Sequence, residues 1–243
     1  MTWFAQAPEL LGALLDIAMP RHCAGCGSPM SDKPGHLCWD CLAQLPIIQP
    51  PYCAICGDPV DGAIEHEYAC AWCTRRRPAF ELARSAARYR GALKDILHRF
   101  KYSHATFVED DLVSLLSGCA RAHFPCSDVD VVTFVPLHRR KERERTYNQA
   151  RLLASGLARE LGKPMAACAL RVRSTSTQTH LTAEQRAANV KNAFLAREPA
   201  WLDGRTVLLV DDVMTTGATV NECARALKDG GAARVFVATV ARG

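Results

Sequence analysis

Helical and extended patterns alternate along the chain from about residue 79 to its end. Three segments carry apolar residues at i, i+3, i+4 and i+7, and a fourth carries leucine at every fourth position, the period of a helix with one buried face. These segments are 93–100, 112–119, 220–227 and 153–161. Nearly continuous β-branched runs predict strands buried on both faces at 129–135, 207–210 and 235–240. The alternation predicts an α/β domain with a parallel sheet and crossover helices.

The first 78 residues lack this alternation. Residues 1–20 hold an apolar helical pattern, but polar side chains interrupt it and no Lys or Arg precedes it, which argues against a secretory signal. No other segment approaches the length of a membrane span. Residues 21–78 are rich in Cys, Pro and Gly. We therefore expect three parts: an N-terminal apolar helix at 1–20, a cysteine-rich region at 21–78 and the α/β domain at 79–243.

Composition sets further bounds. The chain has 243 residues, of which 49% are hydrophobic and 23% charged, so disorder, collagen and a bare coiled coil are excluded. The net charge of +5 is too small to indicate nucleic acid by itself. Basic residues nevertheless gather at 75–101 and 138–151. These two segments are either solvated helix faces or surfaces that meet phosphate.

Cysteine usage is the anomaly of this composition. Eight of the twelve cysteines form four C-x-x-C pairs, and the step of 30 from Cys23 to Cys53 marks an internal repeat. Two residues between cysteines allow a tight turn to aim both sulfurs at one metal, and two pairs supply a closed tetrahedral zinc site. The candidate ligands are Cys23, Cys26, Cys38, Cys41, Cys53, Cys56, Cys70 and Cys73.

A closed site has no position for water, so we expect two structural zinc ions that fold a region too poor in apolar runs to build its own core. Disulfides and a dithiol redox pair are the alternatives. We expect a cytoplasmic protein, in which thiols stay reduced, and redox pairs rarely come four at a time. The repeat favours sequential pairing of the ligands, while a cross-braced arrangement (first pair with third) stays open.

The sharpest motif is VLLVDDVMTTGAT at 207–219, where an apolar strand is expected to end at Val210. Ligands of open parallel sheets bind beyond the carboxyl ends of the strands, and a helix N-terminus favours phosphate. Asp211 and Asp212 can accept hydrogen bonds from the vicinal hydroxyls of a ribose, whereas an acidic helix cap would explain only one of them. The residues expected to hold the attached phosphate are Thr215, Thr216, Gly217, Ala218 and Thr219.

This motif resembles the phosphoribosyl pyrophosphate signature of type I phosphoribosyltransferases. With four cysteine pairs ahead of it, the chain resembles the ComF (competence protein F) family, a double zinc ribbon joined to a phosphoribosyltransferase-like domain. Three further blocks agree: YRGALKDILHRFKY at 89–102, VPLHRRKERERTYNQARLLA at 135–154 and QTHLTAEQRAANVKNAF at 178–194. Thr146-Tyr147 stands where a Gly-aromatic pair is common in the family, so the local turn is expected to differ.

The resemblance implies a parallel-sheet phosphoribosyltransferase-like fold that binds phosphoribosyl pyrophosphate, or a similar ribose phosphate, with Mg²⁺. The basic loop after the strand at 129–135 resembles the family's pyrophosphate loop. Guanidinium groups suit phosphate, so we select Arg139, Arg143 and Arg145, with surface pairing to nearby Glu as the alternative. Residues 174–189 resemble the family's mobile loop. Further candidates near substrate are Lys101, Gln178, Arg186 and Asn189.

Two functions of different class follow. The resemblance favours an enzyme, a phosphoribosyltransferase with an unidentified acceptor, linked to DNA uptake in natural competence. The alternative is a non-catalytic module that binds phosphate or single-stranded DNA and works with DNA-uptake proteins. Trp39, Trp72 and the basic run at 75–77 could stack bases and contact phosphates, or the two tryptophans could pack against the ribbon itself.

Overall fold

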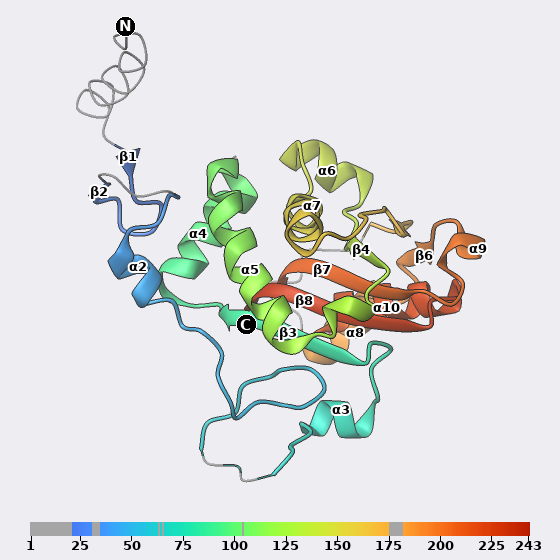
Figure 1. Ribbon diagram of the computed structural model, residues 1–243. Helices are drawn as coiled ribbons and strands as arrows, with labels where there is room; N and C mark the ends of the chain where they lie inside the picture. The colour runs from blue at the N-terminus through green and yellow to red at the C-terminus, as the bar shows by residue number, and fades with distance from the viewer. Residues whose placement is uncertain (1–20, 31–34, 63, 65, 104, 175–181) are drawn as a thin grey trace, which may run out of the picture.

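A four-stranded parallel sheet lies at the centre of the molecule (Figure 1). The computed structural model describes residues 21–30, 35–62, 64, 66–103, 105–174 and 182–243, so the expected helix at 1–20 lies outside the described residues. In the order β3-β8-β7-β4, the strands are β3 (Leu82–Arg88), β8 (Arg234–Arg242), β7 (Thr206–Met214) and β4 (Val131–Phe134).

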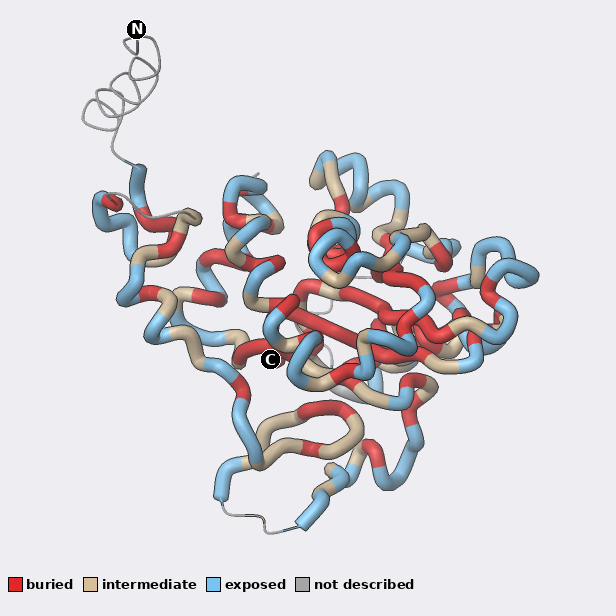
Figure 2. The backbone as a smooth tube through the Cα atoms, in the orientation of Figure 1, coloured by how far each residue is buried: buried red, intermediate tan, exposed pale blue. Residues whose placement is uncertain are grey.

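Helices cover both faces of this sheet, because its strands are apolar on both sides. Leu208 and Val210 of β7 pack into one hydrophobic cluster, and Val207 and Leu209 pack into the other. The first cluster contains residues of α4 (Gly91–Tyr102), α5 (Glu109–His123) and α7 (Gln149–Leu161). The second contains residues of α10 (Ala218–Asp229). Figure 2 shows the buried residues concentrated along the sheet and the helix faces that meet it.

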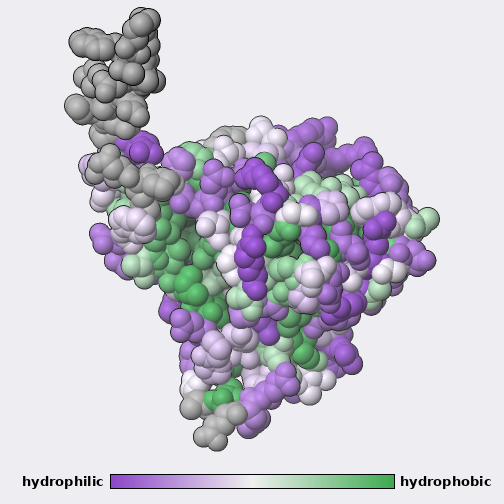
Figure 3. All heavy atoms as spheres, viewed as in Figure 1, coloured by the Kyte–Doolittle hydropathy of each residue, from purple (hydrophilic) through white to green (hydrophobic). Residues whose placement is uncertain are grey.

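Smaller elements surround this core. Two strands, β5 (Ala169–Arg171) and β6 (Phe194–Ala196), pair antiparallel beside it. The short helices are α6 (Arg139–Arg145), α8 (Ala183–Val190) and α9 (Pro199–Leu202), with 3-10 turns at Thr106–Val108 and Cys126–Asp128. Among the described residues, no helix combines the length and apolar character needed to cross a bilayer. Hydrophilic side chains cover much of the face shown in Figure 3.

The α/β class with a parallel sheet is confirmed, and all four helical segments form helices. Two local expectations are wrong. β7 does not end at Val210 but continues through both aspartates to Met214, because the strand stays paired with β8 over that length. The basic stretch at 139–145 is the helix α6 rather than a loop. β3 was not predicted, because its arginines and alanines hide its strand pattern.

The cysteine-rich part forms two units of the same design. The first unit contains β1 (Arg21–His22), β2 (Pro29–Met30) and α2 (Trp39–Ala43), and the second contains α3 (Ala71–Arg75). Cysteines of the first unit join the hydrophobic cluster of α4, α5 and α7, while those of the second join the cluster of α10. The first unit contacts α4 and α5, whereas the second lies along the edge strand β3, where the Ala83 N–H donates to the Ile55 carbonyl at 2.8 Å.

Candidate functional site

Each cysteine unit gathers four sulfurs around one point. Within each cluster all the Sγ atoms lie within 4.8 Å of one another, the spacing that a single tetrahedral metal ion needs. The clusters are Cys23, Cys26, Cys38 and Cys41, and Cys53, Cys56, Cys70 and Cys73. The ligand pairing is thus sequential, and the cross-braced alternative is excluded. Four thiols in each cluster leave no open coordination position, so the two clusters fit two structural zinc ions, one in each.

The backbone prepares one sulfur of each cluster for a metal. The N–H of Cys38 donates to Cys23 Sγ at 3.2 Å, and the N–H of Cys70 donates to Cys53 Sγ at 3.3 Å. Burial opposes ionisation of these two thiols, but the N–H donors outweigh it and lower the pKa of Cys23 to about 6 and that of Cys53 to about 7. Because zinc binds the thiolate, this geometry suits the metal.

The second cluster is also tied to the last strand of the sheet. Arg242, at the end of β8, is buried and its Nε donates to Asp58 Oδ1 at 2.9 Å. Its guanidinium also lies beside Cys56, with Nη2 4.0 Å from the sulfur. The first cluster is tied to helices instead: Arg99 Nη1 of α4 donates to the Ala24 carbonyl at 3.1 Å, and the His36 N–H donates to Asp111 Oδ2 of α5 at 2.8 Å.

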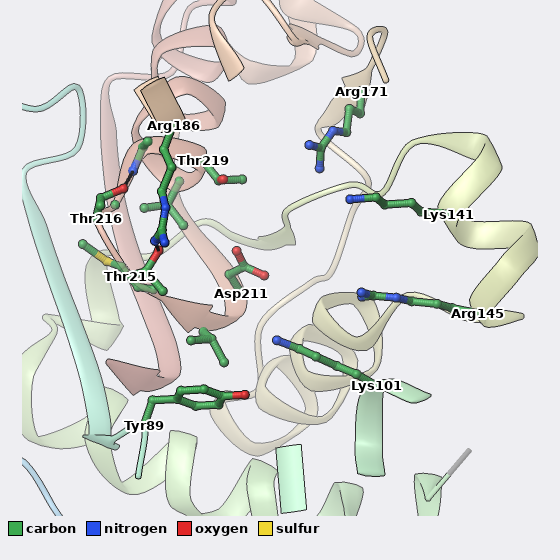
Figure 4. Close-up of a pocket in the computed structure, with 15 residues that line it drawn as sticks. Tyr89, Lys101, Lys141, Arg145, Arg171, Arg186, Asp211, Thr215, Thr216 and Thr219 are labelled. Carbon is green, nitrogen blue, oxygen red and sulfur yellow. Dashed lines mark hydrogen bonds between the residues drawn. The ribbon is translucent and has the colours of Figure 1, made fainter. Parts of the chain in front are cut away.

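A cavity of about 380 Å³ opens where β7 ends and α10 begins (Figure 4). We call it the strand-end cavity. Its lining comes from elements far apart in the sequence, from Tyr89 to Val220, so the fold and not a local motif assembles it. The charged side chains that line it are Lys101, Lys141, Arg145, Arg171, Arg186 and Asp211. Five cations against one acid, among the described residues that line it, make this a site for an anion.

The two aspartates play different parts because successive strand residues face opposite sides. Asp211 is half-buried and faces the cavity, whereas Asp212 is buried and its Oδ2 lies 2.9 Å from Lys101 Nζ. Burial lowers the pKa of Lys101, but the neighbouring Asp212 and Asp211 outweigh it and hold that pKa above its usual value. Lys101 therefore brings a fixed positive charge from α4 to the cavity.

The pKa of Asp211 is also raised, but for a carboxyl group this shift favours the neutral form. Burial and the neighbouring Asp212 raise the pKa of its carboxyl to about 8, although Lys101 and Arg171 act against this shift. A carboxylate in such a place is stabilised by a ligand that donates hydrogen bonds or carries positive charge. Asp211 is thus the acceptor in an otherwise cationic cavity.

The cations opposite Asp211 are themselves crowded. Burial lowers the pKa of Arg171, and burial together with Arg171 and Arg145 lowers the pKa of Lys141. Figure 4 shows Lys141, Arg145 and Lys101 extending toward Asp211 from one side. Repulsion among grouped cations is relieved by a bound anion, so this wall of the cavity favours a polyanionic group.

The 215–219 loop closes the other side of the cavity. Gly217 has φ 77°, the left-handed region, and a Cβ there would lie 2.9 Å from Met214 Cε, so glycine lets the backbone turn directly into α10. The first N–H groups of this 12-residue helix lack intrahelical partners and face the loop. Arg186 Nη1 donates to Thr215 Oγ1 at 3.1 Å and adds a cation to this end.

The structure thus brings together some of the expected site residues and separates others. Asp211, Lys101, Arg145, Arg186 and all five residues of the loop line the cavity. Arg139 and Arg143 line a separate exposed depression with Glu142, on another side of α6, and their assignment as anion contacts stays a prediction. Gln178 lies outside the described residues.

Sequence reasoning missed Tyr89, Lys141 and Arg171. Lys141 and Arg145 are four residues apart and share a face of α6, so a helical assignment of 139–145 would have selected them together. Arg171 comes from the short strand β5, which has no clear period. Thr146, directly after α6, stands where the family commonly has glycine. It adopts φ 63°, so the turn keeps a left-handed backbone despite its β-branched residue.

Comparisons with known proteins agree with this architecture. The model of the double zinc ribbon domain matches residues 14–75, and the model of the phosphoribosyl transferase domain matches residues 148–243. The adenine phosphoribosyltransferase of Leishmania tarentolae aligns over 57% of this chain and 58% of its own at 16% identity, with a TM-score of 0.34, too low to support an argument. The matched domains define a double zinc ribbon followed by a phosphoribosyltransferase-like domain.

Curated relatives place the chain further. The DNA utilization protein YhgH of Salmonella typhimurium is 36% identical over 69% of this chain and 75% of its own. Competence protein F of Haemophilus influenzae is 33% identical over 71% of this chain and 78% of its own. Competence protein ComFC of Bacillus subtilis is 30% identical over 67% of this chain and 65% of its own. The chain belongs to this ComF/YhgH family, as its motifs predicted.

Proposed function

We propose that the strand-end cavity binds phosphoribosyl pyrophosphate, or a similar ribose phosphate, with Mg²⁺. We further propose that the protein transfers the phosphoribosyl group to an acceptor in DNA uptake or utilisation. One observation carries the proposal: the 215–219 loop at the start of α10, Asp211 and five cationic side chains all face one cavity. The names of the relatives, a DNA utilization protein and a competence protein, supply the link to DNA, and reduced zinc-binding thiols favour the cytoplasm.

The ribose phosphate would lie between the loop and the end of β7. Backbone N–H groups and the hydroxyls of Thr215 and Thr216 would donate to the 5′-phosphate, with Arg186 at its edge. Asp211 would accept a hydrogen bond from one ribose hydroxyl. Asp212, the second acid of the expected pair, does not line the cavity and would act there through Lys101, whose charge it holds in place.

The pyrophosphate would meet the cationic wall. Lys101, Lys141, Arg145 and Arg171 converge there and would neutralise the leaving group as its charge develops. Asp211 is the single carboxylate among the described lining residues, so the donor set fits Mg²⁺ only when the substrate supplies most of the oxygens. When bound in this way, Mg²⁺ supplies further neutralisation of the pyrophosphate.

The proposed transfer does not depend strongly on a general base. The bond from ribose C1 to the pyrophosphate oxygen breaks while the bond from the acceptor to C1 forms, and the ring passes through oxocarbenium character. The side chains of the cavity hold the reactants in line, stabilise the departing anion and exclude water. Tyr89, on the floor of the cavity, is placed to cover the sugar.

The test is release of pyrophosphate from phosphoribosyl pyrophosphate and Mg²⁺, screened across nucleobases and nucleic acids as acceptors. Release that depends on one acceptor class supports the enzyme. Saturable binding without release for any acceptor supports the alternative, a non-catalytic binding module that works with DNA-uptake proteins. Absence of both binding and release would contradict the proposal.

A further inference from the structure

A second cavity of about 750 Å³ lies beside the first, between α8, α10 and the helix α3 of the second cysteine unit. We call it the α3 cavity. Ala218, in the first turn of α10, lines both cavities, so both border the start of that helix. The ribose and pyrophosphate would occupy only the strand-end cavity. The α3 cavity therefore has no occupant in the function proposed above.

The α3 cavity follows one face of α10 away from the phosphate loop. Ala218, Asn221, Glu222 and Arg225 recur at i, i+3, i+4 and i+7 and form one wall of it. A group in this cavity would lie on the far side of the 5′-phosphate from the ribose. It would be joined to that phosphate through an ester or a phosphoanhydride bond.

The opposite wall carries an aromatic ring held in place. Trp72 of α3 is half-buried, packs against the hydrophobic cluster of α10 and lines the cavity. The Ala79 N–H, just after α3, donates to Asn221 Oδ1 at 2.8 Å and fixes this segment against α10. The second cysteine unit thus brings an aromatic ring to the cavity from a segment that is hydrogen-bonded to α10, and aromatic rings stack on nucleobases.

The charges of the cavity suit a ligand that continues from a phosphate. Glu222 is already paired, because Arg225 Nη2 lies 2.7 Å from its Oε1. Arg76, Lys191 and Glu184 also line the cavity and make no ion pair among the described residues. The two cations outnumber Glu184 and suit the negative charge of a phosphodiester.

We propose that the two cavities together bind a ribonucleotide whose 5′-phosphate is joined to a further nucleoside, with the base of that nucleoside stacked on Trp72. This inference rests on the proposed function, which places a ribose phosphate in the strand-end cavity. The same chemistry occurs at the 3′ end of an RNA strand, where both ribose hydroxyls are intact, and in dinucleotides joined through pyrophosphate. A 5′-phosphomonoester would leave the α3 cavity empty.

The test uses the full chain with both zinc sites loaded and calorimetric titration with four ligands. These are uridine 5′-monophosphate, the dinucleotide UpU, its deoxy counterpart dTpdT, and diuridine 5′,5′-diphosphate. We expect UpU or the diphosphate to bind about tenfold more tightly than the monophosphate, a gain within the range of one base stacked on an aromatic ring. The ligand that shows the gain identifies the source, an RNA end or a dinucleotide.

Variants decide whether Trp72 supplies that gain. Trp72→Leu should abolish the tenfold difference and leave the affinity for phosphoribosyl pyrophosphate unchanged. Trp39→Leu, in the first cysteine unit and outside both cavities, is the matched control and should bind every ligand as wild type does. Zinc content of two per chain in each variant shows that the units remain folded.

Three results would overturn the inference: equal affinities for the monophosphate and both extended ligands, a gain that survives Trp72→Leu, or, where UpU shows the gain, dTpdT binding as tightly as UpU. Failure of the proposed function looks different, because phosphoribosyl pyrophosphate and the monophosphate would then not bind at all.

Discussion

The cysteine clusters and the strand-end cavity are assembled in opposite ways. Each cluster takes its four ligands from a single short segment, 23–41 or 53–73, and the backbone turns of that segment aim the sulfurs. The cavity takes its charged groups from α4, α6, β5, β7 and α8, which only the folded sheet brings together. The clusters are therefore fixed by local sequence and metal, whereas the cavity depends on tertiary packing.

This difference predicts that loss of a zinc ligand has the largest effect on stability. It also predicts that loss of a ligand from the second cluster, more than from the first, weakens binding in the strand-end cavity. Cys73→Ser should reduce bound zinc from two ions to one and lower the melting temperature of the whole chain. Structural zinc contributes an apparent ~10–16 kcal/mol per site, and the second cluster shares its hydrophobic cluster with β7 and α10. Metal analysis and thermal unfolding provide the measurements.

Cys26→Ser is the matched change in the first cluster, where this cysteine is exposed. It should also cost one zinc ion, but the strand-end cavity should keep its affinity for phosphoribosyl pyrophosphate better than in Cys73→Ser, because the second cluster holds β8 through Arg242. Equal losses of affinity in the two variants would contradict this difference between the units.

The next effect concerns the ion pair at the base of the cavity. Lys101→Met leaves the buried Asp212 without its cation, and breaking one side of a buried pair costs about 3–5 kcal/mol. We expect a loss of this order in the free energy of unfolding, measured in urea, together with weaker ligand binding.

The double variant Lys101→Met with Asp212→Asn separates the two roles of this pair. Removing both charges should restore most of the stability, because no uncompensated charge stays buried. It should not restore binding, which needs the cation. Recovery of both properties would show that Lys101 acts only on stability.

A smaller effect of opposite sign is expected at Asp211. Its pKa of about 8 in the fold lies above its usual 3.8, so the fold disfavours the ionised form, and its destabilising contribution grows as pH rises from about 4 to about 8. Asp211→Asn should therefore raise stability by about 1–2 kcal/mol at pH 8 and by much less at pH 4. Urea unfolding at both pH values measures this difference, and a variant equally stable to wild type at pH 8 would refute it.

The smallest effect lies outside both sites, at Thr146. The left-handed backbone at Thr146 costs a β-branched residue ~1–2 kcal/mol. Glycine removes this strain, but part of the gain is lost because glycine makes the unfolded chain more flexible. Thr146→Gly should thus stabilise the protein by about 0.5–1 kcal/mol in chemical denaturation. Thr146→Ala, which keeps a Cβ, should give less than half of that gain, and the reverse order would rule out backbone strain.

The same comparison explains what the sequence could predict. The eight zinc ligands and the four helices were predicted because each depends on a period or spacing within about 20 residues. The strand motif also placed Asp211 and the loop at one strand end. It could not show that β7 continues past Val210, because that depends on pairing with β8.

The cations of the cavity were harder to predict. Arg139, Arg143 and Arg145 were chosen for the chemistry of guanidinium. Of these three, Arg145 lines the cavity, together with Lys141 from the same face of α6, and the other two do not. Arg171 reaches it from β5, about 40 residues before Asp211, and no local pattern connects the two. Which of many basic residues converge is a property of the fold and not of any one segment.

The most direct measurement is calorimetric titration of phosphoribosyl pyrophosphate with Mg²⁺ into wild type, Asp211→Asn and Asp212→Asn, with Asp110→Asn as control, since Asp110 is exposed and outside the cavity. The account predicts one site per chain in wild type and in the control, and affinities at least tenfold lower in the other two variants, a loss of ~1.4 kcal/mol or more. Equal affinity in all four proteins, or no binding in wild type, would contradict it.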